Sequence, residues 1–398
     1  MLLIHKSEMK QYSLLIILIM LNRLVIPGFN SLSISFAILF FYLIVCLFNK
    51  SVVVNYKLLL KFLTLISVLS ISIMIASFNS NYNMMYLGGG LVVLLYSIFI
   101  FDFKNKFPAR IVLNSMYFFV ILGLFQFLVY KISNFYLDLD LIFNKDFLIQ
   151  GYNSYSGNNY LEKRINGIFF LEPSFFSQFC ALYLILEYSS FNLKNKMKIL
   201  TTLFVLLMTG SGTGIILLLF FIILNFLFKR NLKFFALTIL CFFLAPVIFS
   251  LLLKFFSNFG LYVLERSNEF SLDGDTSFNY RFTLPYILSY SFVSNLDFLS
   301  IFFGNGPITT EEINNRFWKS EVNFSALIVS MFEYGLIFTV LYAKYLYSIA
   351  EKIIKNEIQL SILFMFLFLS GSFYQSYTVI LLWIFFKLLN FNFFGNRA

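Results

Sequence analysis

The sequence predicts an all-α integral membrane protein that forms one polytopic membrane domain over residues 1–398. Hydrophobic residues make up 60% of the chain and its mean hydropathy is +0.84. A water-soluble core of this size could not hide so much apolar surface. The apolar residues lie in stretches of roughly 17 to 25 residues, the length that crosses a bilayer as a helix. Because these stretches lack the polar alternation of membrane β-strands, we expect about twelve transmembrane helices.

The first apolar run begins at Tyr12, after Lys6 and Lys10. It has no small-residue cleavage site, so we expect a retained first helix rather than a removed signal peptide. The apolar runs and the polar breaks between them predict twelve spans along the chain, near residues 12–29, 31–48, 58–77, 84–101, 111–130, 168–189, 197–209, 213–228, 232–253, 322–349, 358–374 and 376–390.

The charges in the polar breaks orient these spans. Lysine and arginine recur after every second span, in the breaks at 49–57, 102–110, 190–196, 229–233 and 350–357. By the positive-inside rule these breaks and both termini are cytoplasmic. The two long breaks on the other side, 131–167 and 254–321, hold nine basic and twelve acidic residues. We therefore expect these two loops to be extracytoplasmic and to form the functional face.

Cysteine and histidine usage excludes several kinds of site. Cys46, Cys180 and Cys241 lie singly within apolar runs without C-x-x-C spacing, which favours buried thiols over a zinc site or a disulfide framework. The one histidine, His5, lies in the amino-terminal tail, so no His-based metal site, triad or general base is expected in the interior. The net charge of +10 comes without a recognisable RNA- or DNA-binding module. We expect no nucleic-acid partner, no metal and no other cofactor.

A first polar motif, Arg164-Ile-Asn-Gly167-Ile-Phe-Phe-Leu-Glu172-Pro173-Ser174, enters the sixth span from the outer side. Pro173 suits the first turn of a helix, and Glu172 would lie near the positive end of the helix dipole. A carboxylate at that depth requires a partner, and Arg164 is a reasonable one. The alternative is a helix-entry cap without chemistry.

A second motif, Thr209-Gly-Ser-Gly-Thr-Gly214, is a small-residue break between two apolar runs. Glycines permit a tight turn there, and its exposed amides could face an anion. It lacks the lysine of a phosphate-binding loop, so a plain turn between helices is the favoured interpretation.

Arginine usage singles out the two outer loops. Four of the eight arginines lie in them (Arg164, Arg266, Arg281 and Arg316), whereas lysine dominates the cytoplasmic breaks. The planar guanidinium grips phosphate oxygens with two hydrogen bonds, so this distribution predicts an anion-binding face. Alternatively, these arginines only pair with neighbouring carboxylates: Arg266, Arg281 and Arg316 with Glu265, Asp273, Asp275 or Glu312. Asp273-Gly-Asp275 is only a weak signal for a divalent ion.

The last motifs flank the tenth span. A turn, Phe303-Gly304-Asn-Gly306-Pro307, comes before it, and Glu321 and Asn323 lie where loop meets helix. Glu333-Tyr-Gly335 lies further along this span, and Glu333 is roughly 18 Å beyond Glu321 at 1.5 Å per residue. That depth favours a buried side chain that accepts interhelical hydrogen bonds or is protonated.

Taken together, these motifs resemble those of the O-antigen polymerase (Wzy) and O-antigen ligase superfamily of bacterial membrane glycosyltransferases. The resemblance lies in their order: an R-x-x-G-x-F-x-x-E-P-S entry helix, a T-G-S-G-T-G turn, an outer loop with E-R, D-x-S and R, a G-x-G-P turn and an N-x-x-x-L helix ending in E-x-G. The ligase branch places histidine where this chain has Val322, which favours a polymerase. Many relatives carry arginine at the position of Gly212, so an anion contact at that turn is doubtful here.

The resemblance implies a GT-C-like polymerase in the bacterial plasma membrane. It would transfer a growing glycan from undecaprenyl pyrophosphate onto a lipid-linked repeat unit at the outer face, for O-antigen, capsule or exopolysaccharide. Its partners would be the two lipid-linked oligosaccharides, the bilayer, and a chain-length regulator and flippase. The catalytic residues would be Arg281, Arg164 and Glu321. Pyrophosphate and sugar would be bound by Arg266, Glu172, Asp273, Asp275, Arg316 and Asn323.

Two other classes of function fit the same composition. A flippase or transporter of lipid-linked sugar should show internal repeats and a polar path at mid-membrane, and the sequence shows neither. A non-enzymatic assembly partner would not need arginine enrichment in its outer loops. An O-antigen ligase of the same superfamily is a third alternative.

Overall fold

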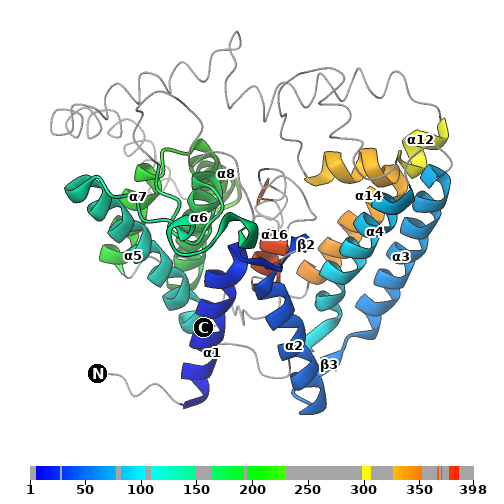
Figure 1. Cartoon of the computed structure of the whole chain (residues 1–398), viewed down its shortest axis with the longest axis horizontal. Helices are drawn as coiled ribbons and strands as arrows, with labels where there is room; N and C mark the ends of the chain where they lie inside the picture. Colours follow the sequence, from blue (N-terminus) through cyan, green and yellow to red (C-terminus); the bar gives the residue numbers. More distant parts are fainter. Residues whose placement is uncertain are drawn as a thin grey trace, which may run out of the picture.

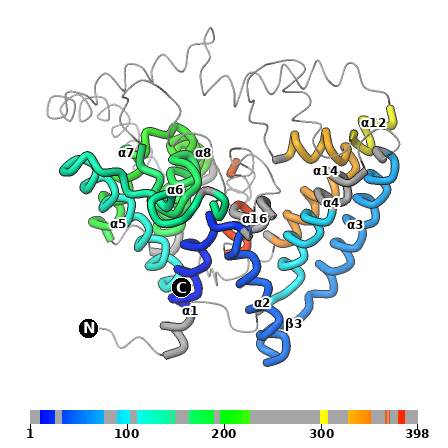
Figure 2. The backbone as a smooth tube through the Cα atoms, in the orientation of Figure 1, coloured from blue at the N-terminus to red at the C-terminus, as the bar shows by residue number. Residues whose placement is uncertain are grey.

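The computed structural model describes residues 6–26, 29–77, 82–103, 109–148, 164–191, 195–229, 298–305, 326–351, 365–366, 369 and 376–384. This part of the chain is mostly helical, as the sequence predicts. In Figure 1, helices α5 to α8 gather on one side and α3, α4 and α14 on the other, with α1, α2 and α16 between them. The smooth trace in Figure 2 shows the same two groups of helices.

The first predicted span, 12–29, is wrong at its carboxyl end. Helix α1 covers Lys6–Met20, and a 3-10 turn, η1, follows at Leu21–Arg23. The chain then forms an antiparallel hairpin from β1 (Val25–Ile26) and β2 (Phe29–Ser33). The polar residues of η1 interrupt the apolar run, and the following Val and Ile favour extended backbone. Hydropathy alone does not distinguish such a short apolar strand from a helix.

Helix α2, Ile34–Phe48, begins where the hairpin ends. The hydroxyl of Ser33 accepts a hydrogen bond from the Phe36 amide at 3.3 Å and so caps the first turn. This start lies close to that of the predicted second span, 31–48.

Two short strands join the ends of the next helices. β3 (Val52–Val54) precedes α3 (Tyr56–Ser77), and β4 (Phe101–Phe103) follows α4 (Tyr82–Ser97) and the 3-10 turn η2 (Ile98–Ile100). β3 and β4 pair antiparallel. The breaks after the second and fourth predicted spans therefore lie at the same end of the helices, as their shared positive charge predicts.

The next four helices match the predicted spans apart from one start. They are α5 (Ala109–Ser133), α6 (Pro173–Phe191), α7 (Lys196–Met208) and α8 (Gly212–Lys229). The sixth span was predicted from residue 168, five residues before the helix begins. Pro173 explains the later start. Its ring fixes φ near the helical value, and the backbone N–H that proline lacks would have no helical partner at the first position.

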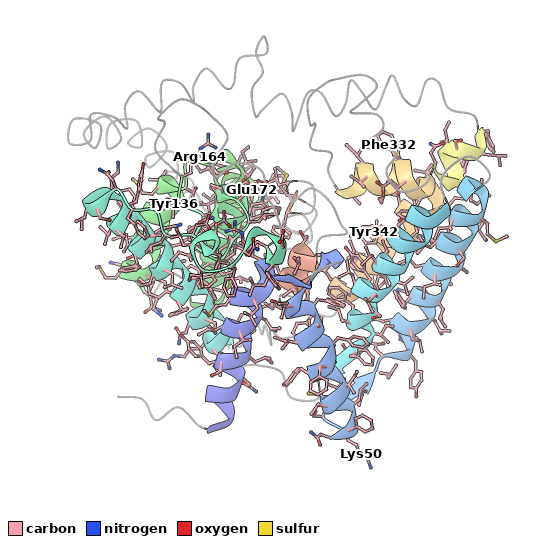
Figure 3. All side chains as sticks on the ribbon, in the orientation of Figure 1. Lys50, Tyr136, Arg164, Glu172, Phe332 and Tyr342 are labelled. Carbon is pink, nitrogen blue, oxygen red and sulfur yellow. The ribbon has the colours of Figure 1, made fainter. Side chains whose placement is uncertain are left out.

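The loop after α5 folds back onto the β1–β2 hairpin. It contains two 3-10 turns, η3 (Leu139–Leu141) and η4 (Lys145–Phe147). Leu24 forms an isolated β-bridge with Leu148, and these two residues pack with Leu139 in a small apolar cluster. Figure 3 shows Tyr136 of this loop near the end of the helices opposite Lys50.

The carboxyl-terminal part supplies α12 (Phe298–Phe303), α14 (Ala326–Glu351) and α16 (Ser376–Trp383). Helix α14 corresponds to the predicted tenth span, 322–349, and packs along α3, where the Ser72 hydroxyl donates to the Tyr334 carbonyl at 2.9 Å. The predicted ninth span, 232–253, lies outside the described residues, as does most of the eleventh.

Three helices of the described chain contain stretches long and apolar enough to cross a membrane: Tyr56–Ile75, Arg110–Ser133 and Leu327–Ile349. Four shorter apolar helical stretches accompany them. Large apolar side chains on α3 are exposed, including Leu60, Leu63 and Met74, and a lipid environment would cover them. A helical, membrane-associated protein is supported, whereas the number of twelve spans and the GT-C-like arrangement stay predictions.

The interior is aromatic and largely apolar. The hydroxyls of Tyr96 and Tyr342 lie 2.6 Å apart between α4 and α14, and both side chains are fully buried. Cys46 and Cys180 are buried free thiols, which confirms the prediction for these two cysteines. Cys241 lies outside the described residues.

Candidate functional site

Two of the nine predicted site residues, Arg164 and Glu172, lie in the part of the chain that the structure describes. Both are partly buried. Figure 3 places Arg164 at the end of the helices opposite Lys50, with Glu172 nearby on the same side. The other seven predicted residues lie outside the described chain: Arg266, Asp273, Asp275, Arg281, Arg316, Glu321 and Asn323.

The segment from Arg164 to Glu172 is an irregular turn that lies against the end of α5. Its backbone takes a left-handed conformation at Gly167 and again at Ile168, both with φ of 67°. Glycine adopts this region readily, but a β-branched residue does so only under constraint. A Cβ on Gly167 would also meet the Phe176 ring at 2.7 Å. The sequence therefore needs glycine at 167, while Ile168 has to be held by its neighbours.

A buried glutamine holds this turn. The Gln126 side chain on α5 accepts a hydrogen bond from the Gly167 amide at 2.9 Å. Its Nε2 donates to the Asn166 side-chain oxygen at 2.8 Å and to the Leu137 carbonyl at 2.6 Å. The Tyr136 hydroxyl donates to the Arg164 carbonyl at 2.6 Å. Side-chain hydrogen bonds from α5 and the following loop thus hold the backbone on both sides of Asn166.

The same network reaches a buried ion pair. Arg23 at the end of η1 pairs with Asp138, and its other terminal nitrogen donates to Asp140 at 2.9 Å. Asn166 Nδ2 donates to Asp138 Oδ2 at 3.4 Å, a long contact. Arg23 is 4% exposed and Asp138 2% exposed. Charges removed from water to this extent require partners, so the pair connects η1, the loop after α5 and the turn before α6.

Burial raises the pKa of Asp138 above the ordinary value for aspartate. The Arg23 guanidinium opposes this rise by attraction and by hydrogen bonding, while the Asp140 carboxylate adds to it. The amide of Leu139 also favours the ionised form. The state of this carboxyl therefore depends on Arg23 staying in place.

The start of α6 brings two of the sequence motifs together. The Ser174 hydroxyl donates to the Glu172 carboxylate at 2.8 Å. The Thr213 hydroxyl of the small-residue turn donates to the Ser174 carbonyl at 3.2 Å, and the Gly214 amide donates to the Ser177 hydroxyl at 3.1 Å. The E-P-S entry and the T-G-S-G-T-G turn thus meet through direct hydrogen bonds between α6 and α8.

Glycine at 214 allows this close approach. A Cβ there would meet the Ser177 carbonyl oxygen at 2.3 Å, whereas a Cβ on Gly212 would meet nothing within 4 Å. The two glycines of one turn therefore differ: Gly214 packs against α6, and Gly212 is exposed. A larger side chain at 212 would have space for its Cβ.

The two motifs around the tenth span also meet. Gly335 takes φ of 85° and breaks the helical geometry within α14. A Cβ on Gly335 would meet the Phe302 carbonyl oxygen at 2.2 Å, and one on Gly304 would meet the Glu333 carbonyl oxygen at 2.5 Å. The Asn305 amide donates to the Phe332 carbonyl at 2.9 Å. The F-G-N-G-P turn is thus joined to the kink in α14. Glu333 is buried, as its depth predicts.

The described part of the predicted site offers one arginine, Arg164, one carboxylate, Glu172, and several hydroxyls at one end of the helices. This set can bind an anion and accept or donate hydrogen bonds to hydroxyl groups. Among the described residues, no group of three or more His, Cys, Asp or Glu is placed to hold a metal ion. Asp273 and Asp275 lie outside the described residues.

Sequence reasoning missed the supporting residues Arg23, Gln126, Asp138 and Asn166. Arg23 carried a usable signal, since it fell within a predicted membrane span, where an ionisable side chain requires a partner. Nothing local in the sequence points to Gln126, because its partners come from residues 11 to 41 positions further along the chain.

Comparison with known proteins identifies no family for this chain. No protein-family model matches it. A search of curated proteins likewise found no significant match.

Proposed function

We propose that this protein is a membrane glycosyltransferase that polymerises lipid-linked oligosaccharide repeat units at the outer face of a bacterial plasma membrane. The donor would be a glycan on undecaprenyl pyrophosphate and the acceptor a second lipid-linked repeat unit. The acceptor hydroxyl would attack the anomeric carbon of the donor. The bond from that carbon to the phosphate oxygen would break, undecaprenyl pyrophosphate would leave, and the hydroxyl proton would pass to a base.

One observation carries this proposal. The arginine-containing E-P-S entry and the T-G-S-G-T-G turn come from separate parts of the sequence, yet their residues are hydrogen-bonded to each other between α6 and α8. Motifs that the polymerase resemblance connects by order are thus also connected in space. A shared site at this end of the helices accounts for both facts.

The roles of the individual residues follow from their chemistry. Arg164, Arg266 and Arg281 would hold the donor diphosphate, since guanidinium groups bind phosphate oxygens bidentately and stabilise the charge of the leaving group. Glu321 would orient or deprotonate the acceptor hydroxyl. The remaining contributors to pyrophosphate and sugar binding would be Glu172, Asp273, Asp275, Arg316 and Asn323.

The location of the site favours a lipid substrate. Arg164 lies at one end of helices whose outward side chains are apolar. A diphosphate could bind at this end while its polyprenyl tail lies along the helices. Fixed arginines could neutralise the leaving group without nucleotide or metal.

The test is incubation of the purified protein with lipid-linked repeat units from the source cells, without nucleotide or metal. We expect a ladder of longer glycans. Arg281→Lys keeps the positive charge but removes the planar guanidinium that binds phosphate with two hydrogen bonds, so this variant should lose most of the polymerised product. Arg110→Lys is the matched control, because Arg110 is exposed and belongs to the opposite, lysine-rich face. Movement of the substrate across vesicles without new bonds would instead indicate a transporter. Transfer to a different lipid acceptor without polymerisation would indicate a ligase.

A further inference from the structure

The backbone before α6 is held in a conformation that its own residues do not favour. Ile168 has φ of 67°, a region that a β-branched side chain enters only when its surroundings require it. The amides of the turn compensate locally: Ile168 N donates to Asn166 Oδ1 at 3.1 Å, and Phe169 N donates to the Gly167 carbonyl at 2.8 Å. Such a turn persists only while its partners stay in place.

Gln126 and Asn166 supply those partners from inside the protein. Gln126 is 0% exposed and Asn166 is 1% exposed. Each uses its side-chain amide for more than one contact: Gln126 binds Gly167, Asn166 and Leu137, and Asn166 binds Ile168, Gln126 and Asp138. Amide side chains have the donor and acceptor pair that this arrangement needs.

The network ends on the charged pair of Arg23 and Asp138, which joins it to η1. It therefore connects three segments: the end of α1, the end of α5 and the turn before α6. Arg164 and Glu172 lie at the two ends of that turn, and the Arg164 carbonyl is itself held by Tyr136.

We infer that Gln126 and Asn166 are positioning residues, which hold the strained turn at 167–168 so that Arg164 faces a lipid diphosphate from a fixed place. This inference rests on the proposed function. Neither residue has to touch the substrate. Their effect would pass through the backbone to Arg164, and misplacement of a binding group by about 1 Å is enough to lower activity about a hundredfold.

The first measurement is hydrogen–deuterium exchange of the segment 164–172 in protein embedded in lipid nanodiscs. Gln126→Met keeps the volume of the side chain but removes its three hydrogen bonds, and we expect faster exchange at Gly167 and Ile168. Asn166→Ala is the second variant, and it removes the acceptor for the Ile168 amide. Tyr96→Phe is the matched control, because it loses one buried hydrogen bond between α4 and α14 and should leave this segment unchanged.

The second measurement is binding of undecaprenyl pyrophosphate, with undecaprenyl monophosphate for comparison, to the same four proteins. We expect wild type and Tyr96→Phe to bind the diphosphate alike, and Gln126→Met and Asn166→Ala to bind it about tenfold or more weakly at equal thermal stability. Unchanged exchange, or unchanged binding in both variants, would overturn the inference and leave the proposed function intact. No preference of the wild type for the diphosphate would overturn the proposed function and with it the role given to these residues.

Discussion

At the scale of single residues, the contact between η1, the loop after α5 and the turn before α6 depends on the buried ion pair of Arg23 and Asp138. Two ionised groups withdrawn from water stabilise a structure only weakly when paired, but either one alone is very unfavourable. Burial already raises the pKa of Asp138, and Arg23 limits that rise. The pair therefore makes the end of α1 dependent on the loop after α5.

Arg23→Gln should be strongly destabilising at neutral pH, by about 3 to 5 kcal/mol, because it leaves Asp138 buried without its main partner. The raised pKa of Asp138 means that the folded state holds the proton more tightly than the unfolded state does. Its ionisation therefore lowers stability as the pH rises from the ordinary aspartate range through the raised folded value. Removing Arg23 raises the pKa of folded Asp138 further and so widens the pH range over which its ionisation lowers stability. The difference in stability between Arg23→Gln and the wild type should therefore be smallest under acidic conditions.

Denaturant unfolding of the wild type and Arg23→Gln at acidic and at neutral pH measures this effect. The double variant Arg23→Gln/Asp138→Asn is the control, since it removes both charges and should recover much of the lost stability. An equal loss at both pH values, or no recovery in the double variant, would show that the pair does not act as described.

For single residues, the sequence predicted where a side chain lies better than it predicted which residues that side chain contacts. Pro173 at the start of α6 and the burial of Glu333 followed from local rules for helix starts and for charges at depth. The partners of Arg23 did not, because they lie 115 and 117 residues away. Hydrophobic periodicity does not show which residues pair across so many positions of the sequence.

At the scale of elements, two glycines allow close contacts between separate helices. Gly214 brings α8 against the Ser177 backbone of α6, and Gly335 brings the kink of α14 against Phe302 of α12. The sequence motifs around both glycines were recognisable, but a turn in sequence does not say what packs on it. Helices α6, α8 and α14 could be predicted, whereas α12 lies within the predicted loop 254–321 and was not expected. The contacts between these helices could not be predicted either.

Gly214→Ala should destabilise the protein by about 1 to 3 kcal/mol, because the new methyl group cannot fit beside the α6 backbone without moving one of the helices. Gly212→Ala is a control two residues away in the same helix, and its Cβ meets nothing within 4 Å. It should be neutral or slightly stabilising. Thermal unfolding in detergent compares them, and equal melting temperatures for the two variants would contradict the close α6–α8 contact.

Gly335→Ala should cost at least about 2 kcal/mol, since it combines a left-handed backbone with a contact of 2.2 Å to the Phe302 carbonyl. Gly90→Ala in α4 is the control, because Gly90 has open space around it. The same unfolding assay applies. Full stability of Gly335→Ala would mean that α14 runs through residue 335 as a regular helix.

At the scale of the whole molecule, the two ends of the helices differ in character. The end at Lys50 carries the β3–β4 pair and exposed positive charge. The opposite end carries Arg164, Glu172 and the buried network that supports them. The membrane orientation that the alternation of charge indicates stays a prediction, whereas the predicted first span wrongly includes part of the β1–β2 hairpin.

Single cysteines placed at the two ends should be modified from opposite sides of the membrane. In a background without Cys46, Cys180 and Cys241, we expect Asn144→Cys to react with an impermeant maleimide in intact cells and Lys50→Cys to react only after permeabilisation. Both wild-type side chains are exposed, so access does not depend on burial. Modification of both from the same side would contradict the predicted orientation.

The most direct test of the central claim is a map of where the substrate binds. A photoreactive analogue of undecaprenyl pyrophosphate, with its diazirine next to the diphosphate, is crosslinked to the protein in nanodiscs, and the modified peptides are identified by mass spectrometry. We expect crosslinks within residues 164–174 and 209–214, which excess unlabelled undecaprenyl pyrophosphate should remove. Specific crosslinks at the opposite end, around Lys50 and the β3–β4 pair, would contradict it.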